Sequence, residues 1–517
     1  MIRRVLIANR GEIALRVIRA CRELGIESVA VYSDADARSP HVAAADLAVH
    51  IGPPSPVASY LNIDALLDAA RQTDADAVHP GYGFLSERAR FARACEEAGL
   101  IFVGPPAAAL ERLGSKIGAR ALMKGAGVPV VPGETPTDQS DQAIRAALDR
   151  VGLPALLKPA AGGGGIGMKT VRARNDIDEA IQRARREALA AFGDGTLYVE
   201  RLVERPRHVE VQVFADTHGH CIHLFERECS VQRRHQKMIE ESPCTSLSPV
   251  LRQRMGEAAV AAARAARYVN AGTVEFLVEG EAERAQFYFL EMNARLQVEH
   301  PVTEAVVGVD LVQGQLRVAA GAELPWRQQN LTQRGHAIEC RVYAEDPARD
   351  FLPQAGTLLR YLEPRGPGIR VDAGYAEGND VSVYYDPLIS KLIVSAESRP
   401  AALRRAVTAL REFAVLGIRT NIPFLIAVLQ HPRFVAGAID TGWLDDAADH
   451  LRDTVAQDEI PVASLAAVIA HQGRSTFGTS TFGTSTTGTS TSGTSGTFGT
   501  TGTSGIDPFI SLENWRG

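Results

Sequence analysis

Val5-Leu6-Ile7-Ala8-Asn9-Arg10-Gly11-Glu12-Ile13-Ala14, close to the beginning of the chain, joins a short apolar run to a polar turn and then to a helical pattern. Apolar residues at helical spacing continue from Ile13 to Leu24, which predicts an amphipathic helix with Gly25 as its C-cap. The apolar run before the turn is typical of a buried strand. A strand followed directly by a helix is the unit from which parallel sheets are built.

The same alternation of strand and helix signals continues to about residue 113. Further strands are predicted at 28–32, 75–79 and 100–103, and further helices at 62–71 and 86–98. The pattern predicts an α/β region with a parallel sheet and helices on its faces. The turn at 9–12 lacks the glycines of a GxGxxG dinucleotide-binding loop, so a dinucleotide site is not expected here.

The composition is that of a globular protein able to bury a core. The chain has 517 residues, of which 45% are hydrophobic and 22% charged, and its formal net charge is -6. This charge gives no reason to expect a nucleic-acid partner, and no apolar run approaches the roughly 18 residues that span a bilayer. Charge returns at Arg10, too soon for a signal peptide. The six cysteines form no CxxC pair, which argues against a zinc ribbon and fits a reducing cytoplasm.

A glycine-rich segment, Lys158-Pro159-Ala160-Ala161-Gly162-Gly163-Gly164-Gly165-Ile166-Gly167-Met168, follows another apolar run. Successive glycines let backbone N–H groups approach phosphate oxygens and form an anion-binding nest. The P-loop pattern fails, because Met168 stands where that pattern requires lysine, and the lysine instead precedes the loop at Lys158. A flexible surface loop is the alternative interpretation, although four consecutive glycines in an ordered region cost stability.

The segment 291–299, Glu-Met-Asn-Ala-Arg-Leu-Gln-Val-Glu, has a polar residue at every odd position. If the segment is extended, these polar side chains share one face. Glu291 and Asn293, with Glu275 upstream, offer the hard oxygen ligands that Mg²⁺ takes. Arg295 suits the binding of an oxyanion, and Glu299 suits a general base. A solvated strand face with ion pairs is the alternative, but it leaves the abrupt apolar run just before the segment unexplained.

Two further stretches are strongly polar. His208-Val209-Glu210-Val211-Gln212-Val213 alternates strictly, so His208, Glu210 and Gln212 share one face of a predicted strand. The segment 226–237 is densely cationic, which indicates either a site that gathers ATP and a small anion or a solvated charged loop. The histidines at 218, 220 and 223 are explained better by a polar hairpin turn than by a metal site.

The remainder of the chain divides into four predicted parts. Residues 330–447 show strand signals followed by a helix near 401–413, and 448–472 form a helical extension. Residues 473–505 consist mainly of Gly, Ser and Thr with an occasional Phe, and 506–517 form a short tail. Because a stretch of that composition cannot bury enough apolar surface to offset its ordering entropy, it is expected to be a flexible linker.

Five long motifs, in this order along residues 1–447, together resemble the biotin carboxylase family of ATP-grasp enzymes. They are Ile7–Ala14, His79–Glu87, Gln232–Lys237, Glu291–Glu304, and Glu339-Cys340-Arg341 with Ala344–Pro347. The resemblance implies an α/β (α+β) fold of three domains. These are a Rossmann-like N-terminal domain at 1–113, an ATP-grasp domain at 114–325 with a mobile lid at about 131–203, and a biotin carboxylase C-terminal domain at 330–447.

The resemblance also implies a role for each residue at a motif position. The ATP-binding residues would be Lys116, Lys158, Gly163, Gly164, Gly165, Glu200, Val203, His208, Gln232, His235, Glu275 and Leu277. The ligands of Mg²⁺ or Mn²⁺ would be Glu275, Glu291 and Asn293. Bicarbonate and biotin would contact Lys237, Arg295, Gln297, Val298 and Arg341. Glu299 would be the base that deprotonates bicarbonate, with Lys237, Arg295 and Arg341 completing the catalytic set. Ile166 departs from the lysine or arginine that is usual in the glycine loop of this family.

The implied activity is the ATP- and bicarbonate-dependent carboxylation of biotin through carboxyphosphate, the first half-reaction of an acetyl- or propionyl-CoA type carboxylase. The chain has no Ala-Met-Lys-Met biotin attachment sequence, so the biotin carrier protein and the carboxyltransferase are expected on separate chains. A cytoplasmic homodimer is the expectation for this family. One alternative is a carbamoyl-phosphate synthetase-like ligase, which would lack the pattern around Arg341. The other is a non-catalytic assembly protein, which would have lost part of the polar set at 275–299.

Deleting residues 473–517 is expected to leave the carboxylation of free biotin unchanged, because a linker and a short tail contribute no side chain to the predicted site. Initial rates of ADP release from the full-length and the shortened chain, measured with saturating ATP, bicarbonate and free biotin, test this expectation. A large loss of rate in the shortened chain would overturn the linker interpretation.

Overall fold

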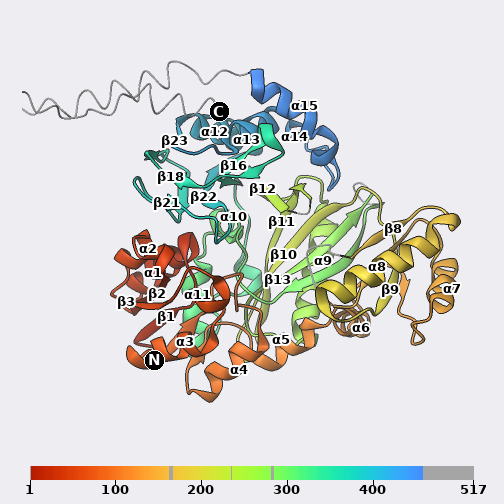
Figure 1. Cartoon of the computed structure of the whole chain (residues 1–517), viewed down its shortest axis with the longest axis horizontal. Helices are drawn as coiled ribbons and strands as arrows, with labels where there is room; N and C mark the ends of the chain where they lie inside the picture. The colour runs from red at the N-terminus through yellow and green to blue at the C-terminus, as the bar shows by residue number, and fades with distance from the viewer. Residues whose placement is uncertain (1, 162–166, 235, 281–283, 458–517) are drawn as a thin grey trace, which may run out of the picture. The chain divides into compact units, whose positions relative to one another are not determined.

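The computed structural model describes residues 2–161, 167–234, 236–280 and 284–457. The N-terminal region forms a five-stranded sheet in the order β3-β2-β1-β4-β5, and every strand is parallel to its neighbours. The strands are β1 (Arg4–Ile7), β2 (Glu27–Ser33), β3 (Leu47–Gly52), β4 (Ala77–His79) and β5 (Ile101–Phe102). The parallel sheet predicted from the alternating pattern is confirmed, and Figure 1 shows this region in red and orange.

Capping residues mark the end of α1 and the beginning of α3 in the N-terminal region. Gly25 follows α1 with φ +68°, a left-handed conformation that glycine adopts without strain. Asn62 caps α3 by accepting a hydrogen bond from the Ala65 N–H at 3.1 Å. The helices of this region are α1 (Gly11–Glu23), α2 (Pro40–Ala44), α3 (Ile63–Gln72), α4 (Ala89–Glu97) and α5 (Ala107–Gly114), and α6 (Lys116–Gly125) follows at the start of the middle region. The sequence pattern does not predict β3 or α2, because β3 is a largely exposed edge strand and α2 has only 5 residues.

An eight-stranded sheet in the order β14-β13-β10-β11-β12-β15-β22-β20 carries most of the predicted site. Five strands come from the middle of the chain: β10 (Arg207–Ala215), β11 (Cys221–Arg233), β12 (Gln236–Ser242), β13 (Asn270–Glu279) and β14 (Gln286–Asn293). Three come from the third region: β15 (His336–Tyr343), β20 (Ile369–Ala373) and β22 (Leu388–Ala396). Antiparallel pairing of β12 with β15 joins the two groups and places Glu240 opposite Glu339. The middle and C-terminal regions therefore share one sheet.

A smaller four-stranded sheet, in the order β6-β9-β7-β8, lies within the segment predicted as a lid. Its strands are β6 (Gly133–Glu134), β7 (Ala155–Pro159), β8 (Lys169–Val171) and β9 (Leu197–Arg201), and its helices are α7 (Asp141–Val151) and α8 (Ile177–Phe192). Both helices pack on the sheet through an apolar cluster that includes Ile144, Leu157 and Ile181. This sheet, shown in yellow and orange in Figure 1, has a core of its own, as a movable lid requires.

The remaining elements cover the eight-stranded sheet and complete the third region. The helices are α9 (Pro249–Ala265), α10 (His300–Val307), α11 (Leu311–Ala319), α12 (Arg399–Glu412), α13 (Ile422–Gln430), α14 (Pro432–Val435) and α15 (Trp443–Gln457). Short strands pair as β16 (Glu345–Asp346) with β17 (Leu352–Pro353), β18 (Gly356–Thr357) with β21 (Asp380–Val381), and β19 (Arg360–Leu362) with β23 (Ala414–Leu416). Helix α12 confirms the helix predicted near 401–413.

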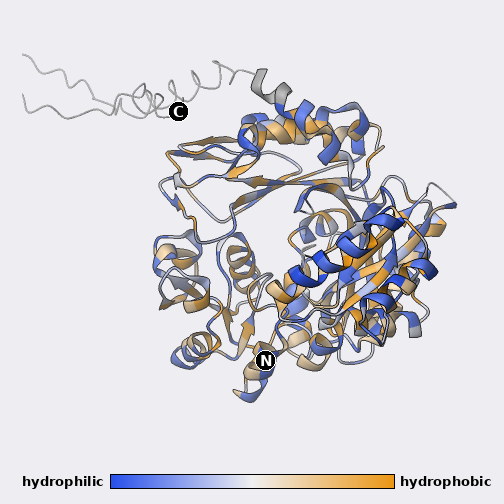
Figure 2. Ribbon diagram, turned by 45° about the vertical axis from the view of Figure 1, so that its right-hand side comes forward, coloured by the Kyte–Doolittle hydropathy of each residue, from blue (hydrophilic) through white to orange (hydrophobic). Residues whose placement is uncertain are grey.

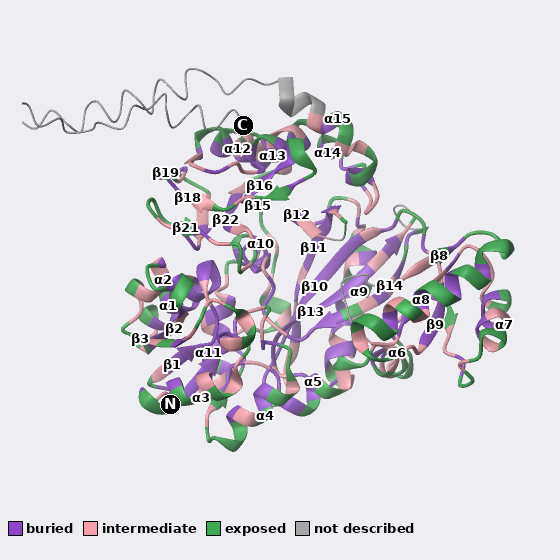
Figure 3. Ribbon diagram, viewed as in Figure 1, coloured by how far each residue is buried: buried purple, intermediate pink, exposed green. Residues whose placement is uncertain are grey.

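Strand β10 is buried on both faces, unlike a strand that faces solvent on one side. Val209, Val211 and Val213 belong to a large apolar cluster. Figure 3 shows β10 and the neighbouring strands β11 and β13 as mainly buried, and Figure 2 shows the apolar residues of the molecule in orange. On the opposite face, His208, Glu210 and Gln212 are at most 6% exposed. Buried polar groups need partners within the protein, so this face requires further polar side chains against it.

The polar segment 291–299 is only partly extended, which corrects the expectation of a single strand face. Strand β14 ends at Asn293, and residues 294–299 form a loop that leads into α10. The ladder stops there because the Ala294 N–H donates to the Glu87 carboxylate at 2.7 Å instead of to a strand. Gln297 and Glu299 are buried, so the interpretation of the segment as a solvated face is wrong.

Some predicted segments lie outside the described residues. They are residues 458–472 of the helical extension, the linker at 473–505 and the tail at 506–517. Within the described part of the chain, no helix combines the length and the apolar character that crossing a membrane requires.

Candidate active site

Three buried carboxylates surround one ammonium group on the polar face of the central strands. Lys237 Nζ lies 2.6 Å from Glu210, 3.0 Å from Glu275 and 2.6 Å from Glu299. Glu210 and Glu275 lie opposite each other on β10 and β13, Lys237 comes from β12, and Glu299 comes from the loop before α10. The three carboxylates are at most 4% exposed. Four separate elements therefore meet at one cation.

The charges in this cluster persist because they are paired, since burial penalises each of them. Burial acts to lower the pKa of Lys237, but the neighbouring carboxylates raise it well above its usual value. Burial acts to raise the pKa of Glu299, yet Lys237 and Arg341 hold it well below its usual value. For Glu275, burial is likewise outweighed by Lys237 and His208, and the pKa is lowered. Glu299 is therefore ionised at neutral pH.

Two arginines contact the outer oxygens of the cluster. Arg341, on β15, donates to Glu240 at 2.6 Å and to Glu299 at 2.9 Å. Arg227, on β11, donates to Glu210 at 2.5 Å. Each carboxylate that faces Lys237 is thus fixed by at least one further polar contact, which sets its direction as well as its charge.

The cationic segment 226–237 is not the solvated charged loop that was one interpretation of its sequence. Its described residues lie on β11, its turn and β12 rather than in a solvated loop. Arg227 is fully buried, and its other N–H groups donate to Gln212, Thr273 and Thr303 at 2.8–3.1 Å. Arg227 is therefore unable to gather a dissolved anion. Its charge holds Glu210, and Lys237 at the other end of the segment faces the cluster.

Arg295 is oriented by acceptors on several sides. Its guanidinium donates to Glu87 at 3.1 Å, to Asn293 at 3.2 Å and to Gln297 at 2.8 Å. Glu87 is the last residue of the 79–87 motif, so the N-terminal region contributes directly to the predicted anion site. Sequence reasoning assigned no role to Glu87, although its position at the end of a long motif was an available signal.

The three predicted metal ligands meet where β13 pairs with β14. Glu275 lies opposite Glu291 in the register, and Asn293 Nδ2 donates to Glu275 at 2.7 Å. His208 Nε2 lies 2.8 Å from the second oxygen of Glu275. Two carboxylates and an amide oxygen are the hard donors that Mg²⁺ and Mn²⁺ accept, so the residues present fit the predicted metal.

Lys116 and Lys158 lie near one another beside the smaller sheet. Burial and the charge of Lys158 lower the pKa of Lys116. Lys158 Nζ donates to Glu200 at 2.7 Å, and Arg120 donates to the other oxygen of Glu200 at 2.6 Å. Lys116 and Lys158 thus repel one another, and Lys158 and Arg120 share one carboxylate. Such a group of cations favours the binding of a polyanion.

The remaining predicted site residues lie on the same strands, close to them, or outside the described residues. Gln232 on β11 pairs with Lys237 in the sheet register, and Leu277 on β13 lies opposite His208. Val203 is buried just after β9, and Val298 lies in the loop that carries Glu299. Gly163, Gly164, Gly165 and His235 lie outside the described residues.

Sequence reasoning also missed two carboxylates of the site, Glu210 beside Lys237 and Glu240 beside Arg341. The signal for Glu210 was present, because it is the middle polar residue of the alternating strand at 208–213. Glu240 had no comparable signal. It joins the site only because β12 pairs with β15 and brings Arg341 beside it.

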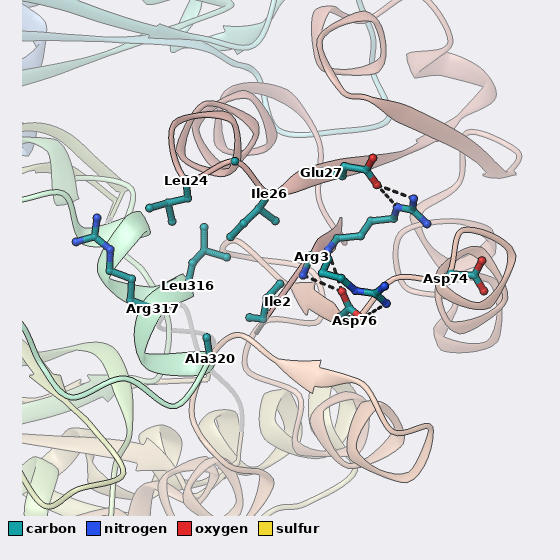
Figure 4. Close-up of a pocket in the computed structure, with 12 residues that line it drawn as sticks. Ile2, Arg3, Leu24, Ile26, Glu27, Asp74, Asp76, Leu316, Arg317 and Ala320 are labelled. Carbon is teal, nitrogen blue, oxygen red and sulfur yellow. Dashed lines mark hydrogen bonds and ion pairs between the residues drawn. The ribbon is translucent and has the colours of Figure 1, made fainter.

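The pocket in Figure 4 lies elsewhere, between α1, α11 and the amino ends of β1 and β2. Leu24, Ile26 and Leu316 form its apolar side, and two arginine–carboxylate pairs line the other side. None of the residues that line it is a predicted site residue. Ligands of parallel α/β sheets bind at the carboxyl ends of the strands, so we assign this pocket no part in the chemistry.

Three family models match consecutive parts of the chain. They are the biotin carboxylase N-terminal domain at residues 1–110, the carbamoyl-phosphate synthase L chain ATP binding domain at 115–327, and the biotin carboxylase C-terminal domain at 339–446. The synthase model matches the ATP-grasp region alone, and biotin carboxylase models match on both sides of it.

Curated relatives include biotin carboxylases and components of larger carboxylases. The chain is 51% identical to a biotin carboxylase of Halalkalibacterium halodurans, over 87% of this chain and 98% of that protein. It is 47% identical to the mitochondrial methylcrotonoyl-CoA carboxylase alpha chain of Mus musculus, over 90% of this chain but 65% of that protein. It is 50% identical to a pyruvate carboxylase component of Methanothermobacter thermautotrophicus, over 86% of this chain and 90% of that protein.

Solved structures of biotin carboxylases have the same fold. One is the biotin carboxylase domain dimer of Hydrogenobacter thermophilus 2-oxoglutarate carboxylase, in complex with MgADP, ADP and bicarbonate. It has a TM-score of 0.83 and 43% identity, and the match covers 87% of this chain and 99% of that chain. The biotin carboxylase of Campylobacter jejuni, in complex with a β-γ-ATP compound, also has a TM-score of 0.83 and 43% identity, over 86% and 99% of the two chains.

Replacing Lys237 by methionine is expected to leave three carboxylates facing one another without their shared cation. Near neutral pH the loss should be about 3–5 kcal/mol of stability, as for other broken buried ion pairs. The pKa of Glu299 should then lie above its unfolded value of about 4.3, so the variant regains stability as the pH falls through the raised pKa. The wild type behaves in the opposite sense, since a lowered pKa contributes stability that is lost only in acid.

Thermal unfolding of the wild type, Lys237→Met and Lys237→Arg between about pH 8 and pH 5 tests this expectation. The deficit of the methionine variant should shrink toward the acid end, and the arginine variant should show a smaller deficit that depends little on pH. A methionine deficit that stays constant over the range would contradict the electrostatic role.

Proposed function

The chain belongs to the biotin carboxylase family of ATP-dependent ligases, and from this we propose that it uses ATP and bicarbonate to carboxylate biotin carried by another chain. The observation that carries the proposal is the ionised Glu299 between Lys237 and Arg341. Bicarbonate must be bound as an anion and deprotonated at the same place, and a carboxylate flanked by cations offers both functions.

In the protein alone, the contacts with Lys237 and Arg341 keep Glu299 a weak base, because they lower its pKa. We assign bicarbonate to Lys237, Arg295, Gln297 and the backbone of Val298. An anion bound there competes with Glu299 for Lys237, so the pKa of Glu299 rises toward the working pH, where a general base is most effective. Glu299 then accepts the proton, and a bicarbonate oxygen attacks the γ-phosphorus of ATP.

We assign the nucleotide to the side of the cluster that is bounded by Lys116 and Lys158. Lys158 would exchange Glu200 for phosphate oxygens, and Lys116 would contact the phosphates beside it. The other residues assigned to ATP are Gly163, Gly164, Gly165, Glu200, Val203, His208, Gln232, His235, Glu275 and Leu277. Glu275, Glu291 and Asn293 would hold Mg²⁺ or Mn²⁺, which neutralises charge on the β- and γ-phosphates when bound. The complex of a similar domain with MgADP and bicarbonate supports this assignment.

In this attack on the γ-phosphorus, the bond from bicarbonate oxygen to phosphorus forms as the bond from phosphorus to ADP breaks, which yields carboxyphosphate and ADP. Carboxyphosphate hydrolyses readily, so we assign the smaller sheet to a lid that excludes water. Arg341 would hold carboxyphosphate and the biotin ring, and Arg295 would stabilise the biotin enolate. Each developing negative charge thus has a preorganised cation near it.

We further propose that the biotin carrier protein and the carboxyltransferase are separate chains, in an acetyl- or propionyl-type acyl-CoA carboxylase. Similarity to a methylcrotonoyl-CoA carboxylase chain supports an acyl-CoA acceptor. A pyruvate carboxylase component is about as similar, because the first half-reaction is the same whatever the acceptor. A homodimer in the cytoplasm completes the proposal, and the dimeric structure of a similar domain supports the oligomeric state.

ADP release by the purified chain, with and without free biotin, tests the proposed function. Biotin should stimulate release in the presence of Mg-ATP, and the stimulation should require bicarbonate. A folded chain that binds ATP but shows no stimulation by free biotin or by a biotinylated carrier domain would point to a different ligase activity.

Replacing Glu299 by glutamine is expected to lower bicarbonate-dependent turnover by about 10²–10⁴-fold, the usual contribution of a general base. Nucleotide affinity should be unchanged, because Glu299 contacts bicarbonate rather than ATP. Steady-state ADP release and titration with a fluorescent ATP analogue measure the two effects. Glu412→Gln, on the exposed face of α12, is the matched control. Near-normal turnover of the Glu299 variant would remove this residue as the base.

A further inference from the structure

A second buried lysine lies behind the proposed base and has no part in the reaction described above. Lys391, on β22, is fully buried. Its ammonium donates to the carbonyl oxygen of Val298 at 2.7 Å and lies 3.2 Å from the Glu12 carboxylate. Lysines are almost never fully buried without a partner, so these two contacts determine where the ammonium lies.

The surroundings of Lys391 keep it charged. Burial acts to lower its pKa, but Glu12, Glu339 and Asp372 outweigh burial and raise it, against a smaller opposing effect of Arg370. Asp372 is already paired with Arg370, at 2.6 Å and 3.0 Å. The Tyr82 hydroxyl donates to Glu12, which orients that carboxylate. Glu12 is therefore the carboxylate in contact with the ammonium.

Lys391 and Arg341 lie opposite each other in the pairing of β15 with β22, so their side chains emerge on the same face of the sheet. Arg341 donates to the side chain of Glu299, and Lys391 donates to the carbonyl of the residue before it. Arg341 and Lys391 are neighbours in one sheet, and they contact the side chain of Glu299 and the peptide group just before it.

The loop at 294–299 needs such contacts, because it has no strand partner. Strand β14 ends at Asn293 and Glu299 is the N-cap residue of α10, so the Val298–Glu299 peptide lies just before the helix and outside its regular hydrogen bonding. The direction of the Val298 carbonyl fixes the plane of that peptide. That plane in turn sets the direction in which the Glu299 side chain leaves the backbone.

We propose that Lys391 is a positioning residue for the base: through the Val298 carbonyl it fixes the peptide from which Glu299 reaches bicarbonate. This inference rests on the proposed function. Glu12 supports Lys391 from the first turn of α1, so the motif at 7–14 acts on the base through one lysine. A displacement of about 1 Å in a reacting group can cost about 10²-fold in rate, which gives such a contact its effect.

Lys391→Met, compared with the wild type, tests the proposal. We expect kcat/KM for bicarbonate to fall by about 10²-fold, with a higher KM for bicarbonate and an unchanged KM for ATP. A merely structural role would lower the fraction of active enzyme, which reduces kcat for both substrates and leaves both KM values unchanged. Lys124→Met, at an exposed position on α6, is the matched control.

A double-mutant cycle with Glu299→Gln separates action through the base from an independent effect. If Lys391 acts through Glu299, the methionine substitution should have little further effect once the base is absent. Additive losses would overturn the proposal. Glu12→Gln keeps the size of the carboxylate and should give a smaller rise in the KM for bicarbonate, which supplies the test if Lys391→Met does not fold.

Failure of the positioning role and failure of the proposed function would give different results. An active wild type whose Lys391→Met and Glu12→Gln variants keep the wild-type KM for bicarbonate would overturn the positioning role alone. A wild type without biotin-stimulated ADP release would overturn the proposed function, and the positioning role with it.

Discussion

The shared ammonium of Lys237 is the interaction on which the rest of the site depends. Glu210, Glu275 and Glu299 converge on it from different elements, and all of them are buried. Without that cation, three negative charges within a few Å of one another would repel strongly in a medium that screens charge poorly. The positions of β10, β12, β13 and the loop before α10 therefore depend on one another. The same side chains serve both the stability of the fold and the proposed chemistry.

Much of the fold could be predicted from local patterns. The helix from Ile13 to Leu24, the strand at 208–213 and the parallel N-terminal sheet follow from spacing, because buried faces leave apolar residues at the period of the element. The candidate residues at 291–299 could be named because they lie in a dense polar segment that follows an apolar run, whereas Arg341 and the role of Lys237 came from the resemblance to the biotin carboxylase family. In the structure, Glu275, Glu291 and Asn293 meet, as do Lys237, Glu299 and Arg341.

What could not be predicted depends on contacts between distant parts of the chain. Glu87 reaches Ala294 across 207 positions, and Lys391 reaches Val298 across 93. Neither periodicity nor spacing carries information about such pairs. The burial of Arg227 escaped prediction for a related reason. A run of charges resembles a solvated segment until the strands that neutralise it are placed beside it, and those strands are distant in sequence.

The shared eight-stranded sheet has a consequence for how chains of this kind can diverge. Because β12 pairs directly with β15, the backbone hydrogen bonds of one sheet join the regions on the two sides of the boundary near residue 330. Genetic recombination at that point would join a middle region to a foreign β15, and the new strand would have to supply both the backbone register and Arg341 beside Glu240. The segments on the two sides of the boundary should therefore be inherited as one block, whereas the smaller sheet has its own core and can change separately if it keeps Lys158 and Glu200 for the proposed nucleotide site.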